Sequence, residues 1–152
     1  MRRVLVIGIG NTTRRDDGAG VRVVEALEQV HPGGWYLAVQ QLTPELADFV
    51  ARADVVIFVD ASVGVTETVY TPVAPAAMPS GSHIASPGVL LRLAGDVFDQ
   101  APAEAVQVAI PVVELGYGEA LAPATKRRVA RVVEVIGGWL AAQEEEGEAE
   151  GD

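Results

Sequence analysis

The chain has 152 residues, and 49% of them are hydrophobic, which suits one compact domain with a sizeable core. Its formal net charge is −10 and it has no cysteine, which excludes disulfides, a cysteine nucleophile and a thiolate metal site. No basic stripe is available to displace counterions from phosphates, so nucleic-acid binding is not expected. No apolar run approaches the roughly 20 residues of a membrane helix. No signal peptide is evident either, so we expect a cytoplasmic protein without a membrane partner.

Apolar runs alternate with amphipathic segments along the chain. In chain order, the expected elements are a strand at 3–9, a helix from about 17 to the turn at 31–34, a strand at 35–40, a short helix opening at 43–45, a strand at 54–59, an edge strand at 66–70, a long loop at 72–88, a helix opening at 86–87, a strand at 105–110 and a helix at 123–143. Strands that alternate with helices predict a doubly wound α/β sheet in a single domain.

The last nine residues, 144–152, carry six acids and no base. They offer no apolar face that could be buried. We therefore expect a folded domain over 1–143, followed by an acidic disordered tail over 144–152.

Three residues with chemically useful side chains follow predicted strands or lie in the long loop. Open α/β sheets bind ligands at the carboxyl ends of their strands. The first strand leads into the turn that carries Asp17, the strand at 54–59 leads into Asp60, and the long loop carries His83. If the two strands are parallel neighbours, both carboxylates emerge at one edge, and the loop can fold back over it. Two carboxylates and one imidazole can form a hard-to-borderline metal site.

Each of these residues also has a purely structural interpretation. Asp16 and Asp17 could cap the first helix. Asp60 could cap a turn at the end of its strand. His83 could be a solvated loop residue. These interpretations leave unexplained why three such residues fall at one predicted edge of the sheet.

Other familiar motifs are incomplete or missing. The Gly8-Ile9-Gly10 segment suggests a dinucleotide fingerprint, but Thr13 replaces the third glycine and the acid expected after the second strand is missing. The only lysine, Lys126, does not follow a phosphate-binding glycine loop. Neither Gly-x-Ser-x-Gly nor His-Glu-x-x-His occurs. A nucleotide-binding protein is therefore a weak alternative.

The segment 8–20, GIGNTTRRDDGAG, resembles the opening signature of the hydrogenase maturation proteases: a strand, Gly-x-Gly-Asn, an acidic pair and Gly-x-Gly. The resemblance continues at 55–61 (VVIFVDA), at Ser82-His83 with Ser86-Pro87, and at 118–123 (GEALAP), covering about residues 1–140. It implies a three-layer αβα domain with a twisted, mostly parallel five-stranded sheet. The histidine loop differs from the His-Gln form of well-studied members, and 113–117 lacks the proline usual in that stretch.

The resemblance also implies a function. Such proteins are endopeptidases that remove a C-terminal peptide from the nickel-loaded large subunit of a [NiFe] hydrogenase, so the precursor would be the protein substrate. Position by position, the resemblance assigns Asp17, Asp60 and His83 as metal ligands and catalytic residues. It implies no permanently bound cofactor, because the nickel is recognised in the substrate. In the family's pattern the second acid of the opening pair serves the site, which leaves Asp16 for capping.

The chemistry of the cut stays open at this point. Either the metal polarises the scissile carbonyl, or one carboxylate activates water as a general base. The backbone amides of Gly10 and Asn11 are candidates for stabilising an oxyanion, and a purely structural role for this glycine turn is at least as well supported. A non-catalytic, metal-dependent binding protein of the same fold is the alternative function.

Overall fold

The computed structural model describes residues 2–81 and 85–151. In chain order, its helices and strands are β1 (Val4–Ile9), the 3₁₀ turn η1 (Arg15–Gly18), α1 (Ala19–Val30), β2 (Trp35–Val39), the 3₁₀ turn η2 (Pro44–Leu46), α2 (Ala47–Arg52), β3 (Val55–Ser62), β4 (Val69–Pro72), α3 (Pro87–Phe98), β5 (Glu104–Pro111) and α4 (Pro123–Gly151). Over these described residues, the helices are each too short or too polar to cross a membrane.

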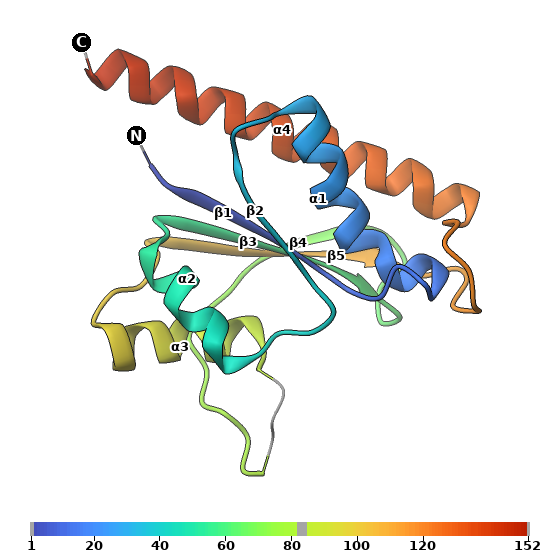
Figure 1. Ribbon diagram of the computed structural model, residues 1–152, viewed down its shortest axis with the longest axis horizontal. Coiled ribbons are helices and arrows are strands. Elements are labelled where there is room, and N and C mark those ends of the chain that lie inside the picture. The colour runs from blue at the N-terminus through green and yellow to red at the C-terminus, as the bar shows by residue number, and fades with distance from the viewer. Residues whose placement is uncertain (1, 82–84, 152) are drawn as a thin grey trace.

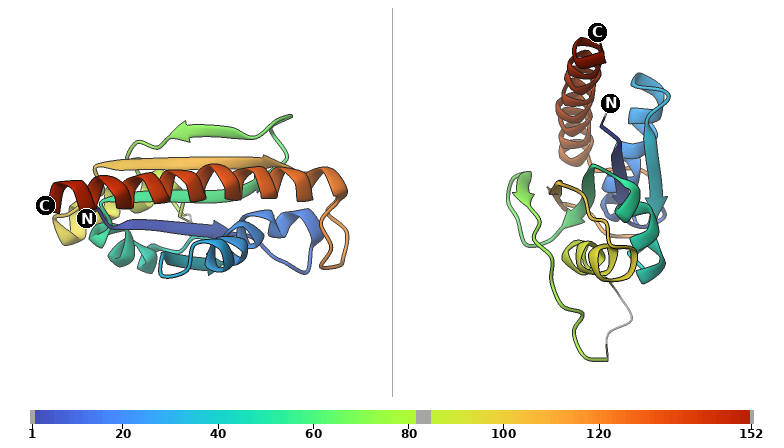
Figure 2. Two further views of the ribbon diagram at one scale, coloured as in Figure 1. Left: turned by 90° about the horizontal axis from the view of Figure 1, so that it is seen from above. Right: turned by 90° about the vertical axis from the view of Figure 1, so that its left-hand side faces the viewer.

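The strands form a single sheet in the order β2-β1-β3-β5-β4. All neighbouring pairs are parallel except β4, which runs antiparallel to β5. Helices α1 and α4 cover one face of the sheet, and α2 and α3 cover the other (Figures 1 and 2). The predicted three-layer αβα domain with a mostly parallel five-stranded sheet is therefore confirmed.

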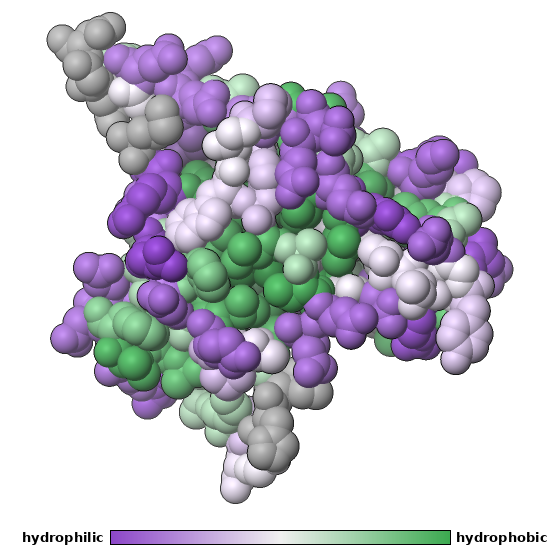
Figure 3. Space-filling view, viewed as in Figure 1, coloured by the Kyte–Doolittle hydropathy of each residue, from purple (hydrophilic) through white to green (hydrophobic). Residues whose placement is uncertain are grey.

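The core consists of one hydrophobic cluster on each face of the sheet. Along β1, Leu5 and Ile7 point to the cluster under α2 and α3, whereas Val6 points to the cluster under α1 and α4. All three are fully buried, which explains why the strand reads as an unbroken apolar run. The edge strand β2 is less covered, and Figure 3 shows apolar side chains gathered on this face between α1 and α2.

Helix α1 approaches the sheet very closely through glycines. A Cβ atom at Gly20 would lie 2.1 Å from the carbonyl oxygen of Val59 and 2.8 Å from that of Ile9. A Cβ at Gly8 would lie 2.3 Å from the carbonyl oxygen of Gly20. Because these neighbours are backbone atoms of the sheet and the helix, they cannot move aside as a flexible side chain could. The glycines therefore seat the start of α1 directly on the carboxyl ends of β1 and β3.

The last helix is longer than predicted. The sequence predicts an end near Gln143, but α4 continues to Gly151, and its C-terminal turns project away from the sheet (Figure 1). Five of the eight residues 144–151 are Glu, a residue that favours helix without needing an apolar face. Glu144 still touches the domain, because its carboxylate lies 3.1 Å from the ring nitrogen Nε2 of His31. The division into a domain over 1–143 and a separable tail stays a prediction, although residues 144–151 are helical.

The close approach of α1 to the sheet can be tested by stability measurements. The control substitution should change the free energy of unfolding in the opposite direction. Gly20→Ala should lower the free energy of unfolding by about 3 kcal/mol, because the methyl group meets rigid backbone. Gly95→Ala, in α3 with nothing within 4 Å of the added Cβ, should raise it by about 0.5–1 kcal/mol. Urea denaturation of both variants measures the difference. Equal stability of Gly20→Ala and the wild type would contradict the close approach of α1.

Candidate active site

The turn between β1 and α1 places the first predicted site residue. Gly10 has a φ angle of 141°, and a Cβ there would lie 1.9 Å from the carbonyl oxygen of Asp17, so the position requires glycine. The backbone N–H of Asn11 donates to Oδ2 of Asp17 at 2.9 Å. The turn thereby fixes the half-buried carboxylate of Asp17 beside the end of β1.

Asp60, near the end of β3, lies at the same carboxyl edge of the sheet. It directly follows the buried part of this strand, and the register pairs Gly8 of β1 with Val59. Both Asp17 and Asp60 line a hollow of about 330 Å³ at the carboxyl edge of the sheet. Its remaining lining residues are Ile9, Gly10, Gln40, Gln41, Leu42, Ala61, Ala85 and Pro87. The structure therefore brings together the two carboxylates that the sequence assigned to one site.

The surroundings of Asp60 change its pKa. Burial raises the pKa of Asp60 to about 6, a hydrogen bond from the backbone amide of Ala61 opposes this rise, and the nearby charge of Asp17 adds to it. Two acids at one hollow favour a bound cation, since a positive charge would relieve their repulsion. Carboxylate oxygens of this kind suit a hard or borderline divalent metal.

His83, the third predicted ligand, lies outside the described residues. Ala85, two positions further along the chain, lines the hollow. Ser86 then caps α3 as predicted, since its hydroxyl oxygen accepts the backbone N–H of Val89 at 3.2 Å. In the ranges 2–81 and 85–151, no three His, Asp or Glu side chains gather closely enough to hold a metal ion. The three-residue metal site thus stays a prediction.

Of the two roles considered for the glycine turn, the hydrogen bonds favour the structural one. The backbone N–H of Gly10 donates to the carbonyl oxygen of Val39 at 2.9 Å, and that of Asn11 donates to Asp17. Both amides are engaged inside the protein and do not stabilise an oxyanion in this conformation. The hydrogen bond of Gly10 holds the end of β1 against the end of β2, and the hydrogen bond of Asn11 positions the Asp17 carboxylate.

Asp16 has a role that the sequence did not reveal. Its side chain is fully buried and accepts four hydrogen bonds, from the backbone N–H groups of Val113 (2.9 Å), Glu114 (2.8 Å) and Ala122 (2.8 Å) and from the hydroxyl of Thr125 (2.6 Å). Burial alone would raise the pKa of Asp16, but these hydrogen bonds outweigh it and lower the pKa below its ordinary value of 3.8. The predicted capping role is therefore wrong, since Asp16 makes no helix cap.

The bonds to Asp16 fasten the loop 112–122 against the turn that carries Asp17. Further contacts join the same two segments: the N–H of Arg15 donates to the carbonyl of Gly118 at 2.8 Å, and the N–H of Gly118 donates to the carbonyl of Thr13 at 2.9 Å. The two loops lie side by side at one end of the molecule (Figures 1 and 2). The turn that carries Asp17 is thus held in place by a segment about a hundred residues further along the chain.

The fold has clear counterparts among solved structures, whereas no protein-family model and no curated protein matches the chain. The hydrogenase maturating endopeptidase HybD from E. coli is 24% identical, with a TM-score of 0.69 over 95% of this chain and 94% of that one. The [NiFe] hydrogenase maturation protease HybD from Thermococcus kodakarensis is 22% identical, with a TM-score of 0.66 over 90% and 98%. HycI from T. kodakarensis KOD1, another such protease, is 22% identical, with a TM-score of 0.68 over 90% and 91%.

The chain has the fold of the hydrogenase maturation proteases. The match spans almost the whole length of those proteins, so the fold that the sequence resemblance implied is confirmed. In this hydrogenase maturation protease fold, Asp17 and Asp60 stand at the carboxyl edge of the sheet, where an open α/β sheet binds its ligands.

The adjacent acids give a stability test with a built-in control. Asp16→Asn should lower the free energy of unfolding by about 3 kcal/mol, because an amide cannot accept from all four donors. Asp17→Asn should cost less than about 1 kcal/mol, because an amide oxygen can still accept the hydrogen bond from Asn11. Urea denaturation at neutral pH measures both. Equal losses in the two variants would contradict the different environments of these neighbours.

Asp16 also allows a test of how stability depends on pH. The folded-state pKa of Asp16 is lowered, so its stabilisation is complete above the pKa of the unfolded chain and is lost as the pH falls through the folded pKa. The stability difference between wild type and Asp16→Asn should therefore shrink below about pH 4. Denaturation curves across this range measure the difference. A gap that stays constant into strong acid would show that Asp16 is not ionised in the fold.

Proposed function

We propose that this protein is an endopeptidase that removes a C-terminal peptide from the nickel-loaded large subunit of a [NiFe] hydrogenase during maturation. The observation that carries the proposal is that Asp17 and Asp60 line one hollow at the carboxyl edge of the sheet, in a fold shared with named maturation proteases. The sequence signature that resembles those proteases also supplies Asp17. We place the reaction in the cytoplasm.

In this proposal Asp17, Asp60 and His83 bind the nickel that arrives inside the substrate, and the protein holds no cofactor of its own. The coupled carboxylates support this role, because a cation at the hollow offsets the charge of both. Gln40 and Gln41, exposed at the hollow, provide amide donors and acceptors for an extended peptide. The proposed site therefore offers negative charge to a metal ion and hydrogen-bonding groups to a substrate peptide.

The reaction adds water across one peptide bond. The large subunit keeps the new carboxylate, and the released peptide leaves with the new amino group. The bound metal centre fixes the position of the scissile bond, which is the main contribution that such a small site can make. Either the metal would polarise the scissile carbonyl toward attack by water, or a carboxylate would activate the water as a general base.

Cleavage of a nickel-loaded large-subunit precursor tests the proposal. Mass spectrometry should show the loss of a C-terminal peptide with the wild type and no loss with Asp17→Asn, Asp60→Asn or His83→Ala. Thermal melting should leave each variant folded. Asp48→Asn, an exposed acid of α2 paired with Arg52, should cut normally and serves as the matched control.

Three outcomes would overturn parts of this assignment. A wild type that binds the precursor without changing its mass would be a metal-dependent binding protein of the same fold. Normal cutting by His83→Ala would remove the loop histidine from the site. Normal cutting by Asp17→Asn would place the site on other residues of the turn.

The metal itself provides a separate test. Three ligands leave coordination positions open, and the nickel is expected to come with the substrate, so the purified protein should hold no tightly bound metal. Elemental analysis after chelation should therefore find well under one metal ion per chain. Stoichiometric metal that survives chelation would indicate a permanent metalloenzyme instead.

A further inference from the structure

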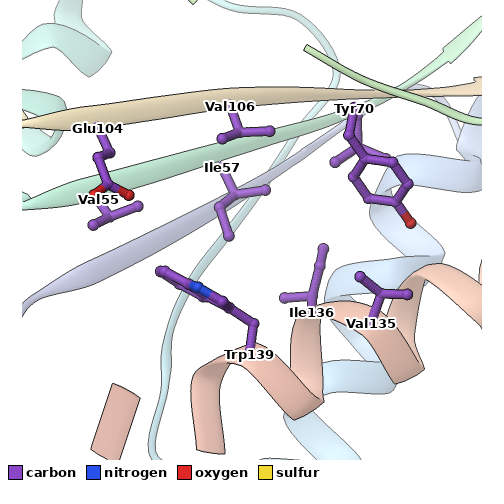
Figure 4. Close-up of a pocket in the computed structure, with 9 residues that line it drawn as sticks. Val55, Ile57, Tyr70, Glu104, Val106, Val135, Ile136 and Trp139 are labelled. Atoms are coloured by element: carbon purple, nitrogen blue, oxygen red, sulfur yellow. The ribbon is translucent and has the colours of Figure 1, made fainter. Parts of the chain in front are cut away.

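A second hollow lies on the opposite face of the sheet from the candidate active site, between α4 and the β4 edge. Its volume is about 220 Å³ (Figure 4). The lining is mainly aliphatic and aromatic and includes Ile57, Val106, Tyr70, Val135, Ile136 and Trp139. Tyr70 and Val135 are 44% and 37% exposed, so the hollow opens to solvent between them. All of β4 is exposed, and among the described strands it pairs only with β5. We call this region, from α4 to β4, the α4 groove.

The charged side chains of helix α4 are segregated along its length, with a basic cluster in the first half and an acidic cluster in the last part. The basic side chains of its first half are Lys126, Arg127, Arg128 and Arg131, and the acids of its last part include Glu144, Glu145, Glu146 and Glu148. Arg128 and Glu146 are separated by five turns of about 3.6 residues and thus lie on one side of the helix. Val135 lies on this side as well, two turns after Arg128. The flank of α4 along the groove is therefore basic at one end, apolar in the middle and acidic at the other end.

We propose that the α4 groove is occupied by a second copy of this chain, whose α4 packs antiparallel to the first in a two-fold symmetric dimer. A two-fold axis that passes near Gly137 places Arg128 of each copy opposite Glu146 of the other. It also sets Val135 of each copy opposite Trp139 of the other, which closes the apolar hollow. Such an interface is isologous, with an aromatic anchor at its centre and charged pairs at its rim.

The charge pattern favours a second copy over a foreign protein. The basic and acidic halves of the flank are complementary to each other only when the helix is reversed, which a two-fold axis provides. An acidic partner would match the basic half but would be repelled by Glu144–Glu146 at the other half. The dimer also leaves the hollow with Asp17 and Asp60 open, because Leu42, Ala85 and Pro87 line that hollow on the other face of the sheet. The inference is thus independent of the proposed peptidase activity.

Sedimentation of the full chain over a range of concentrations tests the dimer. The wild type should associate reversibly, and association should weaken as salt rises, because salt screens the rim pairs. Val135→Glu should raise the dissociation constant about a hundredfold, since it places a charge in the apolar centre. Val97→Glu, on α3 and 65% exposed, is the matched control and should dimerise like the wild type. Circular dichroism checks that both variants are folded.

Charge reversal provides a second test that does not depend on Val135→Glu folding well. Arg128→Glu and Glu146→Arg should each weaken the dimer about tenfold, because every reversed pair becomes repulsive at both symmetric ends. The double variant Arg128→Glu/Glu146→Arg should regain wild-type association, since the pairs are again of opposite charge. A wild type that stays monomeric, a dimer unaffected by Val135→Glu, or a double variant as weak as the single ones would overturn the proposal.

Discussion

The arrangement of the candidate site depends on the missing side chain of Gly20. Because no Cβ separates α1 from the carbonyl oxygens of Ile9 and Val59, the helix starts almost on top of the strand ends. The chain from β1 must then reverse within a few residues, which is possible because Gly10 adopts a positive φ angle. This tight turn leaves Asp17 no position other than the edge where β3 also ends. A single close packing contact therefore determines where the first carboxylate of the site lies.

The 3₁₀ turn before α1 gives two identical neighbours different tasks. Asp16 points toward the loop 112–122 and the start of α4, where three backbone amides of the loop and the hydroxyl of Thr125 stabilise its buried charge. Asp17 lines the hollow and, among the residues that the structure describes, accepts one hydrogen bond, from the backbone N–H of Asn11. A buried carboxylate whose oxygens already accept four hydrogen bonds within the protein cannot also bind a ligand. The division of roles thus follows from hydrogen bonding rather than from residue type.

The sequence predicted the features that local patterns encode. Strands β1 and β3 are buried on both faces and read as apolar runs, and the general rule for open sheets then brought Asp17 and Asp60 to one edge. The partners of Asp16 could not be predicted, because they are three backbone amides and one hydroxyl about a hundred residues away that leave no local signal. The Glu-rich end of α4 was ambiguous, since its composition suits both a solvated tail and a helix.

The bonds between the turn at 11–18 and the loop 112–122 have a consequence for folding. The two segments are joined across most of the chain length, so their contacts close a very long loop and are entropically slow to form. Strand β1 and helix α1 can form early from local contacts, but the turn between them gains its rigid shape only when the C-terminal third arrives. The carboxylate of Asp17 therefore reaches its final geometry late in folding. A partly synthesised chain would carry Asp17 without the geometry that the complete fold gives it.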